Sequence, residues 1–359
     1  MLDPRNHKLA KILVNYSIKA KKGEKILITA TSKAGFPLVQ EIFKLLLEKG
    51  ATPYVQLQDE RLNYLYFQHS TPELIKKESE PALFFANWAD KFITIVADYN
   101  SKELANVDPV KQTLKSIATK RIRDTMFVKK WVLTYYPTSG MAYASSMALH
   151  ELEDFYFESC IKNWDAEKKK MLNMKKILDK SKKVQIIGNK TDLTMNFSER
   201  QFAICAGEYN MPDGEIFGAP LESSTTGRVY FDFPSIYQGK EVQGVDLYFE
   251  KGKVVKWDSH SNKEFLTKML STDEGAKRLG EFGIGTNFSI TQFMYNTLFD
   301  EKMGGTIHLA LGTAFKDKVD GRGENDSAIH WDLVKDLRIK GSKLLVYQKT
   351  ILKDGKILV

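Results

Sequence analysis

Residues 25–57 read K-I-L-I-T-A-T-S-K-A-G-F-P-L-V-Q-E-I-F-K-L-L-L-E-K-G-A-T-P-Y-V-Q-L and decide the architecture of the first part of the chain. The apolar segment Lys25–Ala30 is typical of a buried strand. Residues 36–49 repeat apolar side chains at helical spacing until Gly50, and residues 53–57 form the next predicted strand. A strand, a helix and a strand in this order make a βαβ unit, and such units build parallel sheets.

The remainder of the chain divides into two parts of different character. Further strands are predicted at residues 92–97 and 131–135, with a helix at about residues 110–123 between them, so we expect residues 1–183 to form an α/β domain with a mostly parallel sheet. Short strands dominate after Lys183, and a helix is predicted at residues 290–296. We therefore expect residues 184–359 to form a second, α+β domain, as a chain of 359 residues usually exceeds one core.

Composition excludes several classes of protein. The chain has 43% hydrophobic and 27% charged residues, no apolar run long enough to span a bilayer and no signal-peptide core at its start. Its net charge of +8 raises the alternative of a nucleic-acid binder, but the lysines are dispersed. Cys160 and Cys205 give neither a disulfide framework nor a thiol zinc site. We expect a cytoplasmic protein with neither a membrane nor nucleic acid as partner.

Carboxylates and histidines gather between residues 280 and 332. His330 and Asp332 are two residues apart in the strand-like segment A-I-H-W-D, so their side chains share one face. Glu281 and His308 lie in other strand-like segments, from which His308 could reach the same sheet face. Such a set binds Zn²⁺, Co²⁺ or Mn²⁺ in a hydrolytic site. The alternative is that each histidine is a hydrogen-bonded core residue.

A third carboxylate, Glu215, lies in N-M-P-D-G-E-I-F, where Pro212 and Gly214 bracket a turn that would hold it rigidly. This motif and four others resemble the thermophilic metalloprotease family of aminopeptidases, which includes aminopeptidase T and the aminopeptidase S type. The others are G-R-V-Y-F-D-F-P (227–234), T-D-E-G-A-K-R-L-G-E-F-G-I-G-T-N (272–287), L-F-D-E-K-M-G-G-T-I-H-L-A-L-G (298–312) and S-A-I-H-W-D (327–332).

The resemblance implies a two-domain, homodimeric, cytoplasmic exopeptidase. Each chain would hold two divalent metal ions and act on peptides. It releases N-terminal residues through a water activated by the dinuclear site. The positions that match the family's metal ligands are Glu215, Glu281, His308, His330 and Asp332. We expect Glu281 to bridge the two ions and to be the catalytic residue, with Glu281 or Glu215 taking the proton from the water.

One position departs from the family pattern. After the first histidine the family usually has A-L-G-x-A-Y, with the tyrosine at the active site, whereas this chain has Phe315. Phenylalanine has no hydroxyl and cannot donate a hydrogen bond to an oxyanion. Two alternatives follow, namely a hydrolase of another amide and a non-catalytic binding protein that keeps the fold and the metal.

Overall fold

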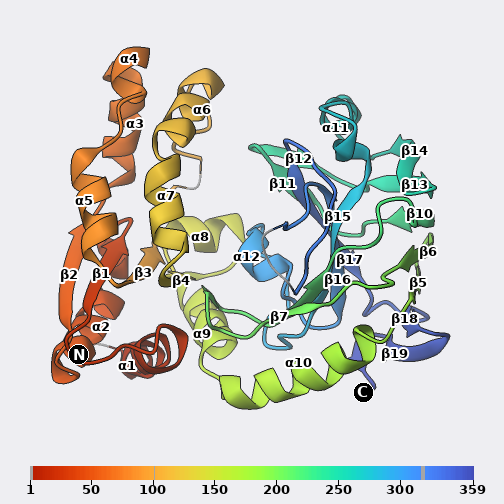
Figure 1. Cartoon of the computed structure of the whole chain (residues 1–359), viewed down its shortest axis with the longest axis horizontal. Coiled ribbons are helices and arrows are strands. Elements are labelled where there is room, and N and C mark those ends of the chain that lie inside the picture. The colour runs from red at the N-terminus through yellow and green to blue at the C-terminus, as the bar shows by residue number, and fades with distance from the viewer. Residues whose placement is uncertain (1–2, 101, 317–319) are drawn as a thin grey trace. The chain divides into compact units, whose positions relative to one another are not determined.

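The contacts within the chain group it into two compact units (Figure 1). The computed structural model describes residues 3–100, 102–316 and 320–359. The first unit is formed by Met1–Lys162 and Gly207–Pro212, and the second by Asn163–Ala206 and Asp213–Val359. The structure thus combines a parallel sheet in one unit with antiparallel sheets in the other, which is a mixed α/β fold.

The division differs from the boundary that we expect after Lys183, and helix α10 (Trp164–Leu178) is the reason. Its apolar face carries Met171, Met174 and Leu178, which are at most 3% exposed and belong to the hydrophobic core of the second unit. Burial of this face against the second unit groups the helix with that unit, although it comes before the change to short strands.

The first unit contains a five-stranded parallel sheet in the order β2-β1-β3-β4-β8. The predicted βαβ unit is confirmed, and its helix ends where Gly50 adopts a positive φ of 72°. The strands are β1 (Lys25–Ala30), β2 (Thr52–Leu57), β3 (Lys91–Val96), β4 (Lys130–Tyr135) and β8 (Asn210–Met211). The helices are α1 (Pro4–Lys11), α2 (Phe36–Glu48), α3 (Glu60–His69), α4 (Pro72–Ile75), α5 (Glu80–Trp88), α6 (Pro109–Ala118), α7 (Lys120–Phe127), α8 (Ser139–Ala144) and α9 (Leu149–Cys160).

The second unit contains two larger antiparallel sheets and a hairpin. The five-stranded sheet has the order β17-β16-β15-β9-β7, made of β7 (Ala203–Cys205), β9 (Glu215–Gly218), β15 (Leu279–Gly285), β16 (Thr306–Gly312) and β17 (His330–Asp336). The eight-stranded sheet has the order β14-β13-β10-β6-β5-β18-β19-β20, made of β5 (Lys183–Gly188), β6 (Thr191–Asn196), β10 (Thr226–Tyr230), β13 (Asp246–Glu250), β14 (Lys253–Asp258), β18 (Lys343–Val346), β19 (Lys349–Lys353) and β20 (Lys356–Ile357). The hairpin and the other helices are β11 (Ser235–Tyr237), β12 (Lys240–Val242), α11 (Lys263–Leu270) and α12 (Thr297–Asp300).

The five-stranded sheet of the second unit has one apolar face and one face that carries titratable side chains, because side chains alternate along each strand. Ile307, Leu309 and Leu311 of β16 belong to the core of the unit, as do Trp331 and Leu333 of β17. The residues between them therefore point to the opposite face. In β16 and β17 this alternation sends the large apolar side chains into the core and places His308, His330 and Asp332 on the opposite face.

The prediction of a helix at residues 290–296 is wrong. The Asp300 carboxylate accepts hydrogen bonds from the backbone N–H groups of Met294 (2.6 Å) and Asn296 (2.7 Å), and Tyr295 between them has a positive φ of 55°. A side chain that binds backbone N–H groups competes with the helical hydrogen bonds of the same segment. The helix that forms instead is the short α12.

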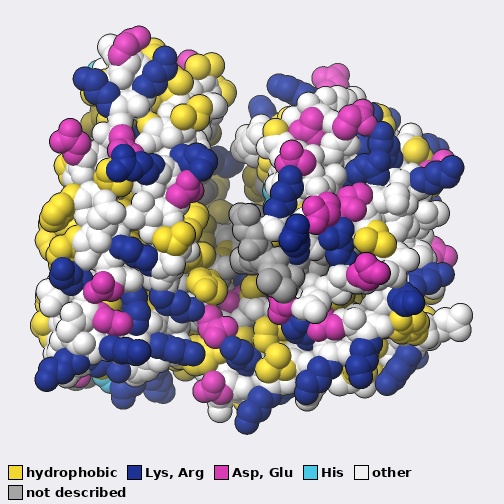
Figure 2. Space-filling view, viewed as in Figure 1, with side chains coloured by type: hydrophobic (Ala, Val, Ile, Leu, Met, Phe, Trp, Pro, Cys, Tyr) yellow, Lys and Arg dark blue, Asp and Glu magenta, His cyan; other side chains and the backbone are white. Residues whose placement is uncertain are grey.

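The surface seen in Figure 2 carries charges of both signs on both units, with lysine and arginine side chains interspersed among acidic ones. Among the described residues, none of the helices combines the length and the apolar character that crossing a membrane requires. The lysine and arginine side chains that give the chain its positive net charge are therefore spread over much of the face that Figure 2 shows.

Candidate metal centre

The structure brings the five predicted site residues to one face of the five-stranded antiparallel sheet of the second unit. Glu215 lies on β9, Glu281 on β15, His308 on β16, and His330 and Asp332 on β17. These strands are successive neighbours in the sheet. Residues that are far apart in sequence thus become adjacent through antiparallel pairing, and the i, i+2 spacing of His330 and Asp332 places both on the shared face.

Small residues at the paired positions leave space for the functional side chains. Gly283 pairs with His308 and Gly285 pairs with Glu215, while Ala310 lies between Glu281 and Asp332 in the register. A Cβ atom on Gly283 would lie 2.2 Å from Nε2 of His308, which is closer than any real contact. Glycine at this position lets the imidazole lie across the neighbouring strand.

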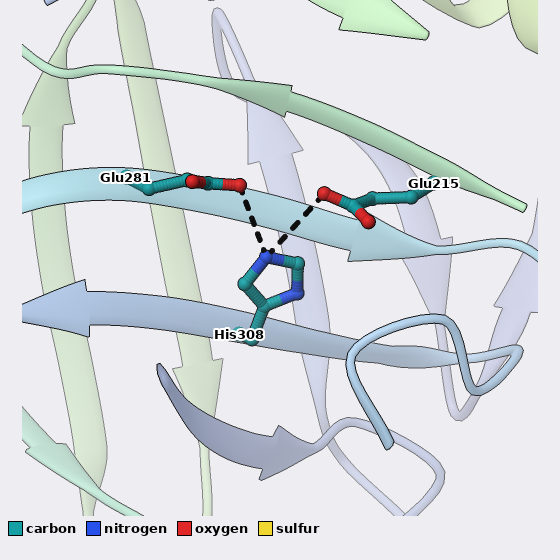
Figure 3. Close-up of side chains that lie close together, drawn as sticks. All are labelled: Glu215, Glu281 and His308. Carbon is teal, nitrogen blue, oxygen red and sulfur yellow. Dashed lines mark hydrogen bonds and ion pairs between the residues drawn. The ribbon is translucent and has the colours of Figure 1, made fainter. Parts of the chain in front are cut away.

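His308 lies between two carboxylates, as Figure 3 shows. Its Nε2 atom is 3.4 Å from Oε1 of Glu281 and 3.7 Å from Oε1 of Glu215. One ligand atom from each of these residues falls within 4.8 Å of the others. All three residues are at most 5% exposed. The set is compact enough to surround one cation with two oxygen donors and one nitrogen donor.

The second histidine extends this arrangement on the other side of Glu281. Nε2 of His330 is 3.5 Å from Oε2 of Glu281 and 3.6 Å from Oδ1 of Asp332. The two carboxylate oxygens of Glu281 therefore face different histidines, Oε1 toward His308 and Oε2 toward His330. A carboxylate shared between two imidazoles has the disposition of a bridging ligand.

Backbone carbonyls fix the orientation of both imidazoles. Nδ1 of His308 is 3.1 Å from the carbonyl oxygen of Glu301, and Nδ1 of His330 is 2.8 Å from that of Thr313. A ring that donates its Nδ1–H to a carbonyl keeps Nε2 for a ligand, which is the usual arrangement of metal-binding histidines. Both Nε2 atoms face carboxylates, so the donor set fits a divalent metal ion.

The electrostatics of the site favour positive charge. Burial by itself would lower the pKa of His308, but the hydrogen bond to Glu281 and the charge of Glu215 raise that pKa to about 10. Burial by itself would also lower the pKa of His330, but its hydrogen bond to Asp332 and the nearby charges raise that pKa to about 10. Without a metal ion, protons on the imidazoles thus compensate the carboxylates.

The prediction from sequence missed two charged residues of this site, Glu301 and Lys302. The Lys302 ammonium, with the side chain 1% exposed, forms ion pairs with Glu301 and, at 3.2 Å, with Oε2 of Glu215. Both residues belong to the motif L-F-D-E-K-M-G-G-T-I-H that precedes His308. The run of three charged residues within that motif, from Asp300 to Lys302, was the signal that could have identified them.

Phe315 lies at the edge of the site. Its ring centroid is 5.7 Å from that of His330 and 5.4 Å from that of Phe217, and the residue is 41% exposed. The residue therefore contacts a proposed ligand from the solvent side. A phenol at this position would place a hydroxyl at the site's edge, and phenylalanine provides none.

Comparison with known proteins covers nearly the whole chain. Residues 2–357 match the family model described as thermophilic metalloprotease (M29). Aminopeptidase 2 of Geobacillus stearothermophilus is 26% identical, over 97% of this chain and 94% of its own. Aminopeptidase T of Thermus aquaticus is 25% identical, over 91% of both chains. Both relatives are named aminopeptidases, in agreement with the resemblance that the sequence motifs indicated.

Solved structures share the fold. Wild-type AmpT from Thermus thermophilus matches with a TM-score of 0.82 at 22% identity, over 99% of each chain. A 2,5-dihydroxypyridine dioxygenase from Pseudomonas putida KT2440 matches with a TM-score of 0.62 at 11% identity, over 99% of this chain and 97% of its own. One fold thus carries proteins of different names, so function rests on the site. The family match over residues 2–357 shows that this chain belongs to the thermophilic metalloprotease (M29) family.

Proposed function

We propose that this protein is a metal-dependent aminopeptidase that holds two divalent metal ions and releases N-terminal residues from peptides. The observation that carries the proposal is the Glu281 carboxylate, whose two oxygens face the Nε2 atoms of His308 and His330 at 3.4 and 3.5 Å. The names of the relatives, aminopeptidase 2 and aminopeptidase T, support peptides as substrates.

The donors divide into two sets that share Glu281. Glu215 and His308 belong with Oε1 of Glu281, and His330 and Asp332 belong with its Oε2. Nitrogen and carboxylate donors without thiolates suit Zn²⁺, Co²⁺ or Mn²⁺. Bound there, the ions would polarise the scissile carbonyl and lower the pKa of a coordinated water to about 7.

The residues of the chain would supply the rest of the reaction. Glu281 or Glu215, both buried, takes the proton from the attacking water as general base. A carboxylate of the site binds the free α-amino group of the substrate and so restricts cleavage to the first peptide bond. Phe315 donates no hydrogen bond to the developing oxyanion, so we expect turnover below that of a protein with tyrosine there.

The assembly and the compartment are proposed on a narrower basis. The family resemblance supports a homodimer. The chain has two cysteines, Cys160 and Cys205, which is too few for a disulfide framework and supports a cytoplasmic protein.

The proposal is tested on metal-stripped protein with short peptides that are either free or blocked at the N-terminus. Zn²⁺, Co²⁺ and Mn²⁺ are restored in turn, and the release of free amino acids is measured. We expect metal-dependent release from the unblocked peptides only. Equal cleavage of blocked peptides, or stoichiometric metal binding without any cleavage, would contradict an aminopeptidase.

A further inference from the structure

Lys302 is a buried cation within a site whose donors suit cations. Its side chain is 1% exposed, and its ammonium forms ion pairs with Glu301 and with Oε2 of Glu215 at 3.2 Å. An ammonium group buried in this way is costly unless it is paired, and two carboxylates pair it here.

The pairing divides the oxygens of Glu215 between two partners. Oε2 contacts Lys302, and Oε1 faces Nε2 of His308 at 3.7 Å. Glu301 turns its carboxylate to the same ammonium, while its backbone carbonyl holds Nδ1 of His308. Lys302 thus contacts two carboxylates in the way that a metal ion between them would.

We propose that Lys302 is a positioning residue that takes the place of a metal ion between Glu215 and Glu301. It leaves Glu215 one oxygen for a metal, keeps Glu301 out of the ligand set and lowers the affinity of the site for divalent cations. The inference rests on the proposed function, because it assigns Lys302 a role toward the metal ions proposed there. Its consequence is that a neutral residue at position 302 strengthens metal binding.

Two substitutions test this role by calorimetric titration of metal-stripped protein with Co²⁺ at pH 8. In Lys302→Met, which keeps an apolar stem without the charge, we expect Co²⁺ to bind at least about tenfold more tightly than in the unaltered protein, since a unit charge beside a divalent ion is removed. In Lys302→Arg, which keeps the charge, we expect affinity within about threefold of that of the unaltered protein.

In case Lys302→Met alone does not fold, the same substitution is also tested in a protein that already carries Glu301→Gln. Glu301→Gln/Lys302→Met leaves no unpaired charge of the pair. We expect it to bind Co²⁺ at least about tenfold more tightly than Glu301→Gln alone, because the lysine is again the difference. Equal or weaker binding in the double variant would overturn the inference.

Lys335 provides a matched control outside the site. It is also buried, and its ammonium pairs with Oδ2 of Asp232 at 2.5 Å. Lys335→Met should bind Co²⁺ within about threefold of the unaltered protein. If the unaltered protein binds no Co²⁺, the proposed function fails and this inference fails with it. If it binds Co²⁺ and Lys302→Met binds no more tightly, the role of Lys302 alone is overturned.

Discussion

Gly283 on β15 lies directly opposite His308 on β16, and the imidazole occupies the space that a side chain at Gly283 would fill. A methyl group there would lie 2.0 Å from Cε1 of the ring and 2.2 Å from Nε2. Gly283→Ala must therefore displace His308 from Glu281. We expect metal affinity to fall by about 10- to 100-fold, as it does when the support of a ligand is lost, measured by calorimetric titration with Zn²⁺.

The control for this substitution is another strand glycine, Gly188 at the end of β5, where a Cβ atom would come no closer to another atom than 3.1 Å, to Oγ of Ser342. Gly188→Ala should leave metal affinity within about threefold of that of the unaltered protein. Unchanged affinity in Gly283→Ala would show that His308 is not a ligand.

Glu281→Gln keeps the shape of the side chain and removes the charge between the two histidines. We expect the rate of peptide hydrolysis to fall by at least about a hundredfold, since a proposed metal ligand that is also one of the two candidate general bases is lost. We also expect the pKa of His308 to fall below its value of about 10, because Glu281 is one of the groups that raise it. Histidine titration by NMR and circular dichroism separate this effect from unfolding, and near-normal activity would remove Glu281 from the mechanism.

Metal binding should strengthen as pH rises. In the metal-free protein the pKa values of His308 and His330 are about 10, and a metal ion must displace both protons. Between pH 6.5 and 9 we expect affinity to increase at least about tenfold per pH unit. Calorimetry in buffers of different ionisation enthalpy counts the protons released, and binding without proton release would contradict the proposed ligand roles.

The same pKa values determine how the stability of the metal-free protein changes with pH. Both histidines have folded-state pKa values above the unfolded value of 6.5. Their contribution to the free energy of unfolding is therefore fully present below pH 6.5 and is lost as pH rises through about 10. Urea denaturation of metal-stripped protein at pH 6, 8 and 10 should show decreasing stability, and a rise across this range would refute the assignment.

Phe315→Tyr restores a phenol beside His330, where the ring centroids are 5.7 Å apart. We expect kcat to increase by about tenfold or more, because one added donor can stabilise an oxyanion substantially. Metal affinity should stay within about threefold of that of the unaltered protein, because replacing the phenyl ring of Phe315 removes no ligand atom. A variant with unchanged kcat would show that the unaltered chain does not lack a donor at this position.

The sequence predicted the parts of the fold that depend on local periodicity. The alternation around His308 and the i, i+2 spacing of His330 and Asp332 placed these side chains on one face, and the register confirms that placement. The motifs correctly identified the family, because they are long and retain their order. These features are properties of single strands and of short segments.

Features that depend on tertiary contacts could not be predicted in this way. The Asp300 carboxylate prevents the helix at residues 290–296 by binding the N–H groups of Met294 and Asn296. Helix α10 belongs to the second unit because its apolar face is buried there. The ion pair of Lys302 with Glu215 joins residues 87 positions apart, and spacing along the chain carries no sign of it.

Anomalous scattering from crystals of the protein loaded with Co²⁺ shows directly how many metal ions the site holds. We expect two peaks per chain that share the Glu281 carboxylate, one beside Glu215 and His308 and the other beside His330 and Asp332. A single peak, or peaks that none of these side chains contacts, would contradict a dinuclear site held by these five residues.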